Sequence, residues 1–193
     1  MLAYVFWHWR SPEVERAAYA DALLEFHRVL AAHRPQGFLG SVVFRTRDAP
    51  WAPTNLEVYE DWYLVTGSAA LDPLNEAAVS GPRKTPHDAV ARWAAGGSGG
   101  LYRLRSGGEG VTDATTATWF SKPADTGYDD FFRALRPWTA RPGATLWQRQ
   151  MTLGPATEFC LLAPAPLDSP PGAGAVMLRV ERIWAEVSAF QKR

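Results

Sequence analysis

The chain has 193 residues, of which 47% are hydrophobic and 21% charged, and these ordinary values favour a folded globular protein over a disordered or fibrous one. Its 20 basic and 20 acidic residues balance, and no stretch gathers the dense Lys and Arg stripe that binds a phosphate backbone, so no nucleic-acid partner is expected. The single cysteine, Cys160, can form no internal disulfide and lies in an apolar run, where a thiol usually behaves as a small core side chain.

The first residues predict a strand that leads directly into a helix. Residues 2–9 are rich in β-branched and aromatic side chains, and Ser11-Pro12-Glu13 is typical of a helix start with Ser as the cap. The helix should pack one stripe of residues at three- and four-residue steps against a core: Tyr19, Leu23, Phe26, Leu30 and His33. The N-terminal segment has no basic leader and is too short to span a bilayer, so we expect a cytoplasmic protein with no membrane partner.

The rest of the first half completes a strand-helix-strand-strand-helix-strand order. The signals predict paired strands at 38–47 and 56–65, helices at 69–79 and 86–95, a glycine run at 96–100 that ends the second helix, and a closing strand at 101–105. This order is the ferredoxin-like βαββαβ pattern.

The second half repeats part of this order. It predicts a strand at 112–121, a helix containing Phe131, Phe132, Leu135 and Trp138, paired strands at 145–153 and 158–163, a strand at 176–184 and a short helix at 186–193. The proline-rich segment 164–174 replaces the second crossover helix. We therefore expect an α+β fold of two ferredoxin-like units with antiparallel sheets, the first at 1–106 and the second at 107–193 with its second helix lost or shortened.

The segment Leu56-Glu57-Val58-Tyr59-Glu60-Asp61-Trp62, followed by a helix with Ala and Leu, resembles the third strand of antibiotic-biosynthesis monooxygenases and related dimeric α/β-barrel families. The segment Leu178-Arg179-Val180-Glu181-Arg182-Ile183-Trp184 is a fainter echo of the same motif. The resemblance implies that two ferredoxin-like units pack sheet to sheet into a barrel, which a chain with two units can form alone.

Members of this superfamily include cofactor-free oxygenases of aromatic polyketides, haem enzymes, lyases and proteins without known activity, so the fold alone does not choose a function. The motif tryptophan corresponds to Trp62, but the polar amide that some of these oxygenases carry four residues earlier falls at Val58. The axial histidine of a haem enzyme would come from the second unit, whereas all four histidines lie in the first half: His8, His27, His33 and His87. No metal-ligand spacing and no glycine-rich nucleotide motif is present, so we expect neither a metal nor a cofactor.

His8 is the candidate catalytic base. Strand alternation places it on the same face as Tyr4 and Phe6, where it would act in an aromatic pocket. The alternative is a partly solvated histidine at a strand end. His87 is expected on the surface, and His27 beside the core stripe of its helix.

Either face of the strand at 56–64 could point toward the pocket. Trp62 shares a face with Glu60 and Val58, while Tyr59, Asp61 and Tyr63 share the other. The apolar face suits packing against helices, which would turn Tyr59 toward the barrel interior, whereas the family resemblance places Trp62 in the pocket. Both Tyr59 and Trp62 are therefore candidate substrate-binding residues.

Four further residues are candidates for substrate binding. Arg179 and Glu181 share a strand face, and with Arg149 they could form an internal ion pair that binds a carboxylate or enolate; a solvated charged face is the alternative. Trp119 is one of several strand tryptophans that suit either an aromatic ligand or a sheet-to-sheet core.

The leading hypothesis is a barrel protein that binds a small apolar or aromatic organic molecule and carries out cofactor-independent oxidation or proton transfer. The alternative is a noncatalytic barrel, which a sealed interior with no cavity would favour. Two units per chain can complete a barrel without a partner, while exposed aromatic strand faces could drive formation of a homodimer.

Overall fold

The computed structural model describes residues 1–152, 157–168 and 172–188. In these residues four α-helices and nine strands follow in the order β1 (Leu2–Arg10), α1 (Arg16–Ala32), β2 (Phe38–Arg47), β3 (Glu57–Val65), α2 (Leu71–Ala78), α3 (Lys84–Trp93), β4 (Ala94–Ser106), β5 (Thr116–Ser121), α4 (Tyr128–Thr139), β6 (Thr145–Thr152), β7 (Phe159–Ala163), β8 (Ala173–Arg179) and β9 (Glu181–Val187). Short 3-10 helices precede α2, α3 and β5. Among these elements, no helix is long and apolar enough to cross a membrane.

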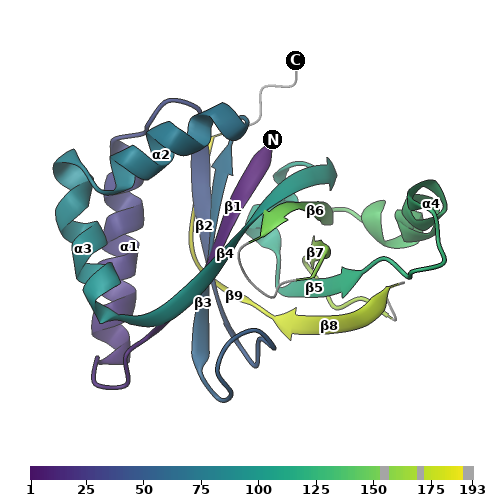
Figure 1. Ribbon diagram of the computed structural model, residues 1–193, viewed down its shortest axis with the longest axis horizontal. Coiled ribbons are helices and arrows are strands. Elements are labelled where there is room, and N and C mark those ends of the chain that lie inside the picture. The colour runs from purple at the N-terminus through teal and green to yellow at the C-terminus, as the bar shows by residue number, and fades with distance from the viewer. Residues whose placement is uncertain (153–156, 169–171, 189–193) are drawn as a thin grey trace.

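All nine strands belong to one antiparallel sheet in the order β8-β5-β7-β6-β4-β1-β3-β2-β9. The strands β4-β1-β3-β2 have the ferredoxin-like order, and β8-β5-β7-β6 have the same order in the second half. The long strand β4 pairs with β1 on one side and β6 on the other, and so joins the two halves (Figure 1). The predicted α+β fold with antiparallel sheets is confirmed, while the division into repeated units at residue 106 stays a prediction.

The two ends of the sheet are joined through the chain itself. Only Val180 separates β8, which pairs with β5, from β9, which pairs with β2. The backbone N–H of Val180 donates to the Thr115 carbonyl (2.9 Å), and the Thr46 hydroxyl donates to the Arg179 carbonyl (2.8 Å). These contacts close the sheet into a barrel.

The prediction of one strand at 176–184 is therefore wrong, because the chain changes strand partner at Val180. The predicted C-terminal helix is also wrong at its start, since Glu186 and Val187 belong to β9 and pair with β2. Residues 189–193 of that prediction lie outside the described part of the chain.

The barrel interior is filled by tryptophans. Trp7, Trp62, Trp119 and Trp147 are fully buried, with ring centroids 5.2 Å apart for Trp7 and Trp119 and 5.3 Å apart for Trp62 and Trp147. Glu60 lies among them, and the indoles of Trp7 and Trp62 donate one hydrogen bond to each of its carboxylate oxygens (2.8 and 2.6 Å). This side of the sheet is therefore a packed aromatic core.

Helices cover the outer face of the barrel. Helices α1, α2 and α3 lie over the first half of the sheet, and α4 lies far from them over the second half (Figure 1). Residues Phe131 and Leu135 of α4 belong to the same buried cluster as Phe120 and Phe159.

Helix α1 begins at Arg16 and not at the predicted Ser11 start. Ser11 lies five residues before the start of α1, whose N-cap position is Glu15; the Ser11 backbone N–H donates to the Trp93 carbonyl (2.7 Å), and its hydroxyl donates to Glu13. The prediction that His33 belongs to the core stripe is also wrong, because His33 is exposed at the end of α1. His27, which was expected beside the stripe, is fully buried.

The glycine run does not end the helix but lies inside β4, paired with β1. A Cβ atom at Gly97 would lie 2.6 Å from the Phe6 ring, and one at Gly99 would lie 2.9 Å from the Tyr4 hydroxyl. Glycine is needed here because the aromatic rings of β1 lie directly over the backbone of β4.

Candidate functional site

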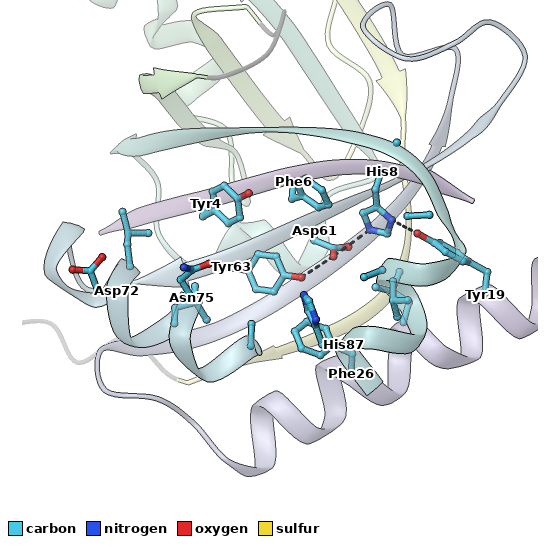
Figure 2. Close-up of a pocket in the computed structure, with 18 residues that line it drawn as sticks. Tyr4, Phe6, His8, Tyr19, Phe26, Asp61, Tyr63, Asp72, Asn75 and His87 are labelled. Carbon is cyan, nitrogen blue, oxygen red and sulfur yellow. Dashed lines mark hydrogen bonds and ion pairs between the residues drawn. The ribbon is translucent and has the colours of Figure 1, made fainter. Parts of the chain in front are cut away.

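A cavity of about 630 Å³ lies between the outer face of the sheet and helices α1–α3. Strands β1 and β3 form one wall with Tyr4, Phe6, His8, Asp61 and Tyr63 (Figure 2). The helices supply a mostly apolar opposite wall: Leu23, Phe26, Leu71, Leu74, Val90 and Ala91. His87 of α3, predicted on the surface, is half-buried and lines the cavity too. This volume is in the range of small-molecule sites.

The strand wall of the cavity is a row of stacked rings. Tyr4 stacks with Phe6 (centroids 6.2 Å apart) and with Tyr63 (6.0 Å), and Phe6 stacks with His8 (5.5 Å). The glycines of β4 let these rings lie flat against the sheet. A flat aromatic wall facing aliphatic side chains suits a planar aromatic ligand.

Asp61 is the centre of the polar end of the cavity. Its Oδ2 atom accepts a hydrogen bond from the Tyr63 hydroxyl (2.8 Å) and lies 3.2 Å from His8 Nε2 and 3.3 Å from His27 Nε2. Burial alone would raise the pKa of this carboxyl, but the two histidines outweigh it and hold the pKa well below its usual range. Asp61 is therefore a buried carboxylate, and its Oδ1 atom has no hydrogen-bond partner among the described residues.

His8 connects Asp61 to Tyr19. Its Nδ1 atom lies 2.6 Å from the Tyr19 hydroxyl, and both side chains line the cavity. With a proton on Nε2 toward Asp61, Nδ1 is free to accept the hydrogen bond that the Tyr19 hydroxyl donates. Asp61, His8 and Tyr19 thus form a carboxylate–imidazole–hydroxyl row at one end of the cavity (Figure 2).

His27 lies on the other side of Asp61 and, like His8, has one ring nitrogen near the carboxylate and the other near a hydroxyl. It does not line the cavity. Its Nδ1 atom lies 2.8 Å from the Ser41 hydroxyl, which in turn accepts a hydrogen bond from the indole of Trp184 (3.2 Å). His27 is fully buried and stacks on Tyr63 with centroids 5.2 Å apart. His27, held by Ser41, therefore lies at ion-pair distance from Asp61.

The tyrosines of the cavity remain hydrogen-bond donors. Burial, reinforced by the negative charge of Asp61, raises the pKa of Tyr4, Tyr19 and Tyr63 above that of an exposed tyrosine. Their hydroxyls consequently stay protonated at neutral pH.

The structure brings three of the candidate residues from the sequence together at the cavity: Tyr4, Phe6 and His8. Tyr59 lies on the same face and stacks on His8 (centroids 5.6 Å apart), but its hydroxyl donates to Glu57 and it supports His8 without lining the cavity. Trp62 and Trp119 lie on the opposite face, in the barrel interior. The face with Trp62 therefore packs against other tryptophans and not against helices.

The three charged candidates lie away from this cavity. Arg149 is exposed on β6, in the other half of the sheet. Arg179 and Glu181 lie where β8 passes into β9, in a separate, more open hollow of about 620 Å³, and Glu181 pairs there with Arg45.

Sequence reasoning did not select Asp61, Tyr63, Tyr19 or His27 as site residues. A signal for His27 was present, because Tyr19, Leu23 and His27 follow one another at four-residue steps and so share one helix face. No sequence signal predicts that this face of α1 contacts Asp61, because strand β2 lies between α1 and β3 in the chain. Throughout the described ranges, no group of three or more His, Cys, Asp or Glu side chains is arranged to hold a metal ion.

No model of a known protein family matches this sequence, and no curated protein matches it either. Similar solved structures include a "putative monooxygenase" from Fusobacterium nucleatum subsp. nucleatum ATCC 25586, with a TM-score of 0.61 and 9% identity over 96% of this chain and 94% of that one. A "putative monooxygenase" from Lactobacillus acidophilus NCFM has a TM-score of 0.59 and 12% identity over 96% of both chains. An "anthrone oxidase-like protein" has a TM-score of 0.52 and 10% identity over 98% of this chain and 94% of that one. At these identities the likeness shows the fold alone, and this chain shares the dimeric α/β-barrel fold of the three structures.

Proposed function

We propose that this protein binds a planar aromatic molecule in the cavity and acts on it as a cofactor-independent monooxygenase that begins with proton removal. The observation that carries the proposal is the row of Asp61, His8 and Tyr19 at the polar end of an aromatic-lined cavity. The names of the structures with the same fold support the choice of an oxygenase.

The row of side chains can move a proton away from the ligand. The Asp61 carboxylate lies 3.2 Å from His8 Nε2 and favours a proton on that nitrogen, which leaves Nδ1 as the acceptor. As an acidic hydroxyl or C–H of the ligand gives its proton to the Tyr19 oxygen, Tyr19 passes its own proton to His8 Nδ1. The imidazolium that forms is stabilised by the adjacent Asp61 carboxylate.

The remaining anion of the ligand would then react with dioxygen, which is the oxidant of the proposed reaction. For anthrone, the ring CH₂ group loses two hydrogens and becomes a carbonyl, one oxygen atom enters the product, and the other leaves as water. The apolar helix wall limits the access of water to the reacting anion.

The test is the rate of oxygen uptake with anthrone near pH 6.5, corrected for the reaction without protein, in the wild type and in His8→Gln. We expect kcat to fall by about 100-fold or more in His8→Gln, because a positioned general base contributes at least this much. His33→Gln is the matched control, since His33 is exposed at the end of the same helix that carries Tyr19. Equal rates in wild type and His8→Gln would overturn the assignment of His8.

A binding protein without turnover is the second candidate. It is favoured by the observation that the hydroxyls of Tyr19 and Tyr63 already have acceptors within the chain. This function predicts saturable binding of anthrone with no protein-dependent oxygen uptake.

A further inference from the structure

The lining of the cavity carries two carboxylates, Asp61 and Asp72, and two histidines, His8 and His87. Among the described residues that line the cavity there is no Lys or Arg. The negative charge of Asp61 is offset by the nearby His8 and His27, and its carboxylate accepts a hydrogen bond from Tyr63. No ion pair or hydrogen bond of the described residues occupies Asp72, so its charge is available to a ligand.

Asp72 lies at the end of the cavity opposite His8. It is in the first turn of α2, where the partial positive charge of the helix end favours a carboxylate, and Asn75 follows it three residues later on the same face. Figure 2 shows Asp72 and Asn75 at one end of the cavity, and His8 and Tyr19 at the other. Both residues are exposed, while the neighbouring Leu74 is buried, so α2 presents a polar edge at the mouth above an apolar wall.

We propose that the ligand of this cavity is an arylalkylamine, an aromatic ring that carries a basic alkylamine, whose ring lies along Tyr4, Phe6 and Tyr63 and whose ammonium group reaches Asp72 and Asn75. The inference rests on the proposed function for the aromatic cavity and adds the charge of the substrate. The carboxylate of Asp72 and the amide oxygen of Asn75 both accept hydrogen bonds from an ammonium group. The ring faces along the strand wall also attract a cation.

An anionic ligand is disfavoured by the same arrangement. A carboxylate at the mouth would lie beside Asp72, and among the described residues no Lys or Arg of the cavity lining would offset the repulsion. The arginines Arg16, Arg45, Arg47 and Arg179 gather instead in the separate hollow at the junction of β8 and β9.

The experiment measures binding of three fluorescent probes that share one ring system: 9-(aminomethyl)anthracene, 9-anthracenemethanol and 9-anthracenecarboxylate. In the wild type at low salt we expect the amine to bind about 5-fold more tightly than the alcohol, as an exposed ion pair allows, and the carboxylate to bind most weakly. In Asp72→Asn the amine should bind no more tightly than the alcohol. In Glu76→Gln the preference should persist, because Glu76 is exposed on the same helix but does not line the cavity.

Screening by salt gives an independent readout, and 0.5 M NaCl should reduce the preference for the amine while leaving the affinity for the alcohol unchanged. Equal affinities for amine and alcohol in the wild type, or a preference that survives Asp72→Asn, would overturn the amine proposal and leave the aromatic cavity standing. Failure of all three probes to bind would overturn the aromatic cavity itself, and with it the proposed function.

Discussion

Two adjacent carboxyl groups on β3 lie in opposite environments. Asp61 faces the helices, where His8 and His27 hold its pKa below the usual range. Glu60 faces the barrel interior, where burial and, to a smaller extent, the nearby Asp61 raise its pKa to about 7 despite the hydrogen bonds from Trp62 and Trp7. The difference follows from strand alternation, which places neighbours on opposite faces of the sheet.

These shifts predict how stability depends on pH. For Glu60 the pKa is higher in the folded protein than in the unfolded chain, so the folded state is favoured below pH 4.5 and loses stability as the pH rises from 4.5 to about 7. For Asp61 the pKa is lower in the folded protein, so its contribution is present above pH 3.8 and is lost as the pH falls below that value.

We therefore expect the free energy of unfolding to decrease between pH 4.5 and 7 in the wild type, and to change much less over this range in Glu60→Gln, which cannot ionise. Urea unfolding at several pH values measures both curves. Glu158→Gln is a control, because Glu158 is a half-exposed carboxyl outside the barrel interior. The same slope in wild type and Glu60→Gln would contradict the role given to Glu60.

At the scale of elements, β4 is the feature that sequence patterns describe least well. Its glycines are weak strand formers, yet they lie within a 13-residue strand because the rings of β1 occupy the space where their side chains would be. The backbone of β4 thus shapes the aromatic wall of the cavity from behind.

Gly97→Ala should destabilise the protein by about 2 kcal/mol, because the new Cβ would lie 2.6 Å from the Phe6 ring and 2.8 Å from the Trp7 carbonyl oxygen. The displaced Phe6 ring should also weaken binding of 9-anthracenemethanol. Gly67→Ala is the matched control, since a Cβ there has no atom within 4 Å. Urea unfolding and a fluorescence titration measure the two effects, and similar stability of both variants would argue against close packing at Gly97.

At the scale of the whole molecule, the sheet separates a packed interior from a hollow exterior. Trp62 and Trp147 contact each other inside the barrel, whereas Phe6 and Tyr63 line the cavity outside it. Stability and ligand binding should therefore respond to different substitutions.

Trp62→Phe should lower the free energy of unfolding by about 2 kcal/mol, because it removes buried surface and one hydrogen bond to Glu60. The same substitution should leave the affinity for 9-anthracenemethanol within about 2-fold, a change well below 1 kcal/mol. Phe6→Ala, on the cavity side, should weaken binding more than Trp62→Phe does. A large loss of affinity in Trp62→Phe would show that the barrel interior and the cavity are not independent.

Closure of the barrel within one chain follows from the passage of β8 into β9 at Val180. This arrangement needs no second chain to complete the sheet, and the formation of a homodimer stays a prediction.

The sequence by itself determined the elements whose signals are local. The content of β-branched and aromatic side chains predicted β1, and strand signals on either side of a proline-rich loop predicted β2 and β3. Three- and four-residue spacing predicted the buried face of α1 with Tyr19, Leu23 and Phe26. The resemblance of the segment ending at Trp62 to the dimeric α/β-barrel families led to the fold that the solved structures share.

Only the tertiary structure decided which partner each face meets. It placed the glycines of β4 under the rings of β1, divided the last strand at Val180, turned Trp62 into the barrel, and brought His8, His27 and Asp61 together from β1, α1 and β3. The local sequence determines the spacing of apolar residues along a strand or helix. The contacts that each face makes depend instead on pairing between segments that are far apart in the chain, and a short sequence pattern carries no information about that pairing.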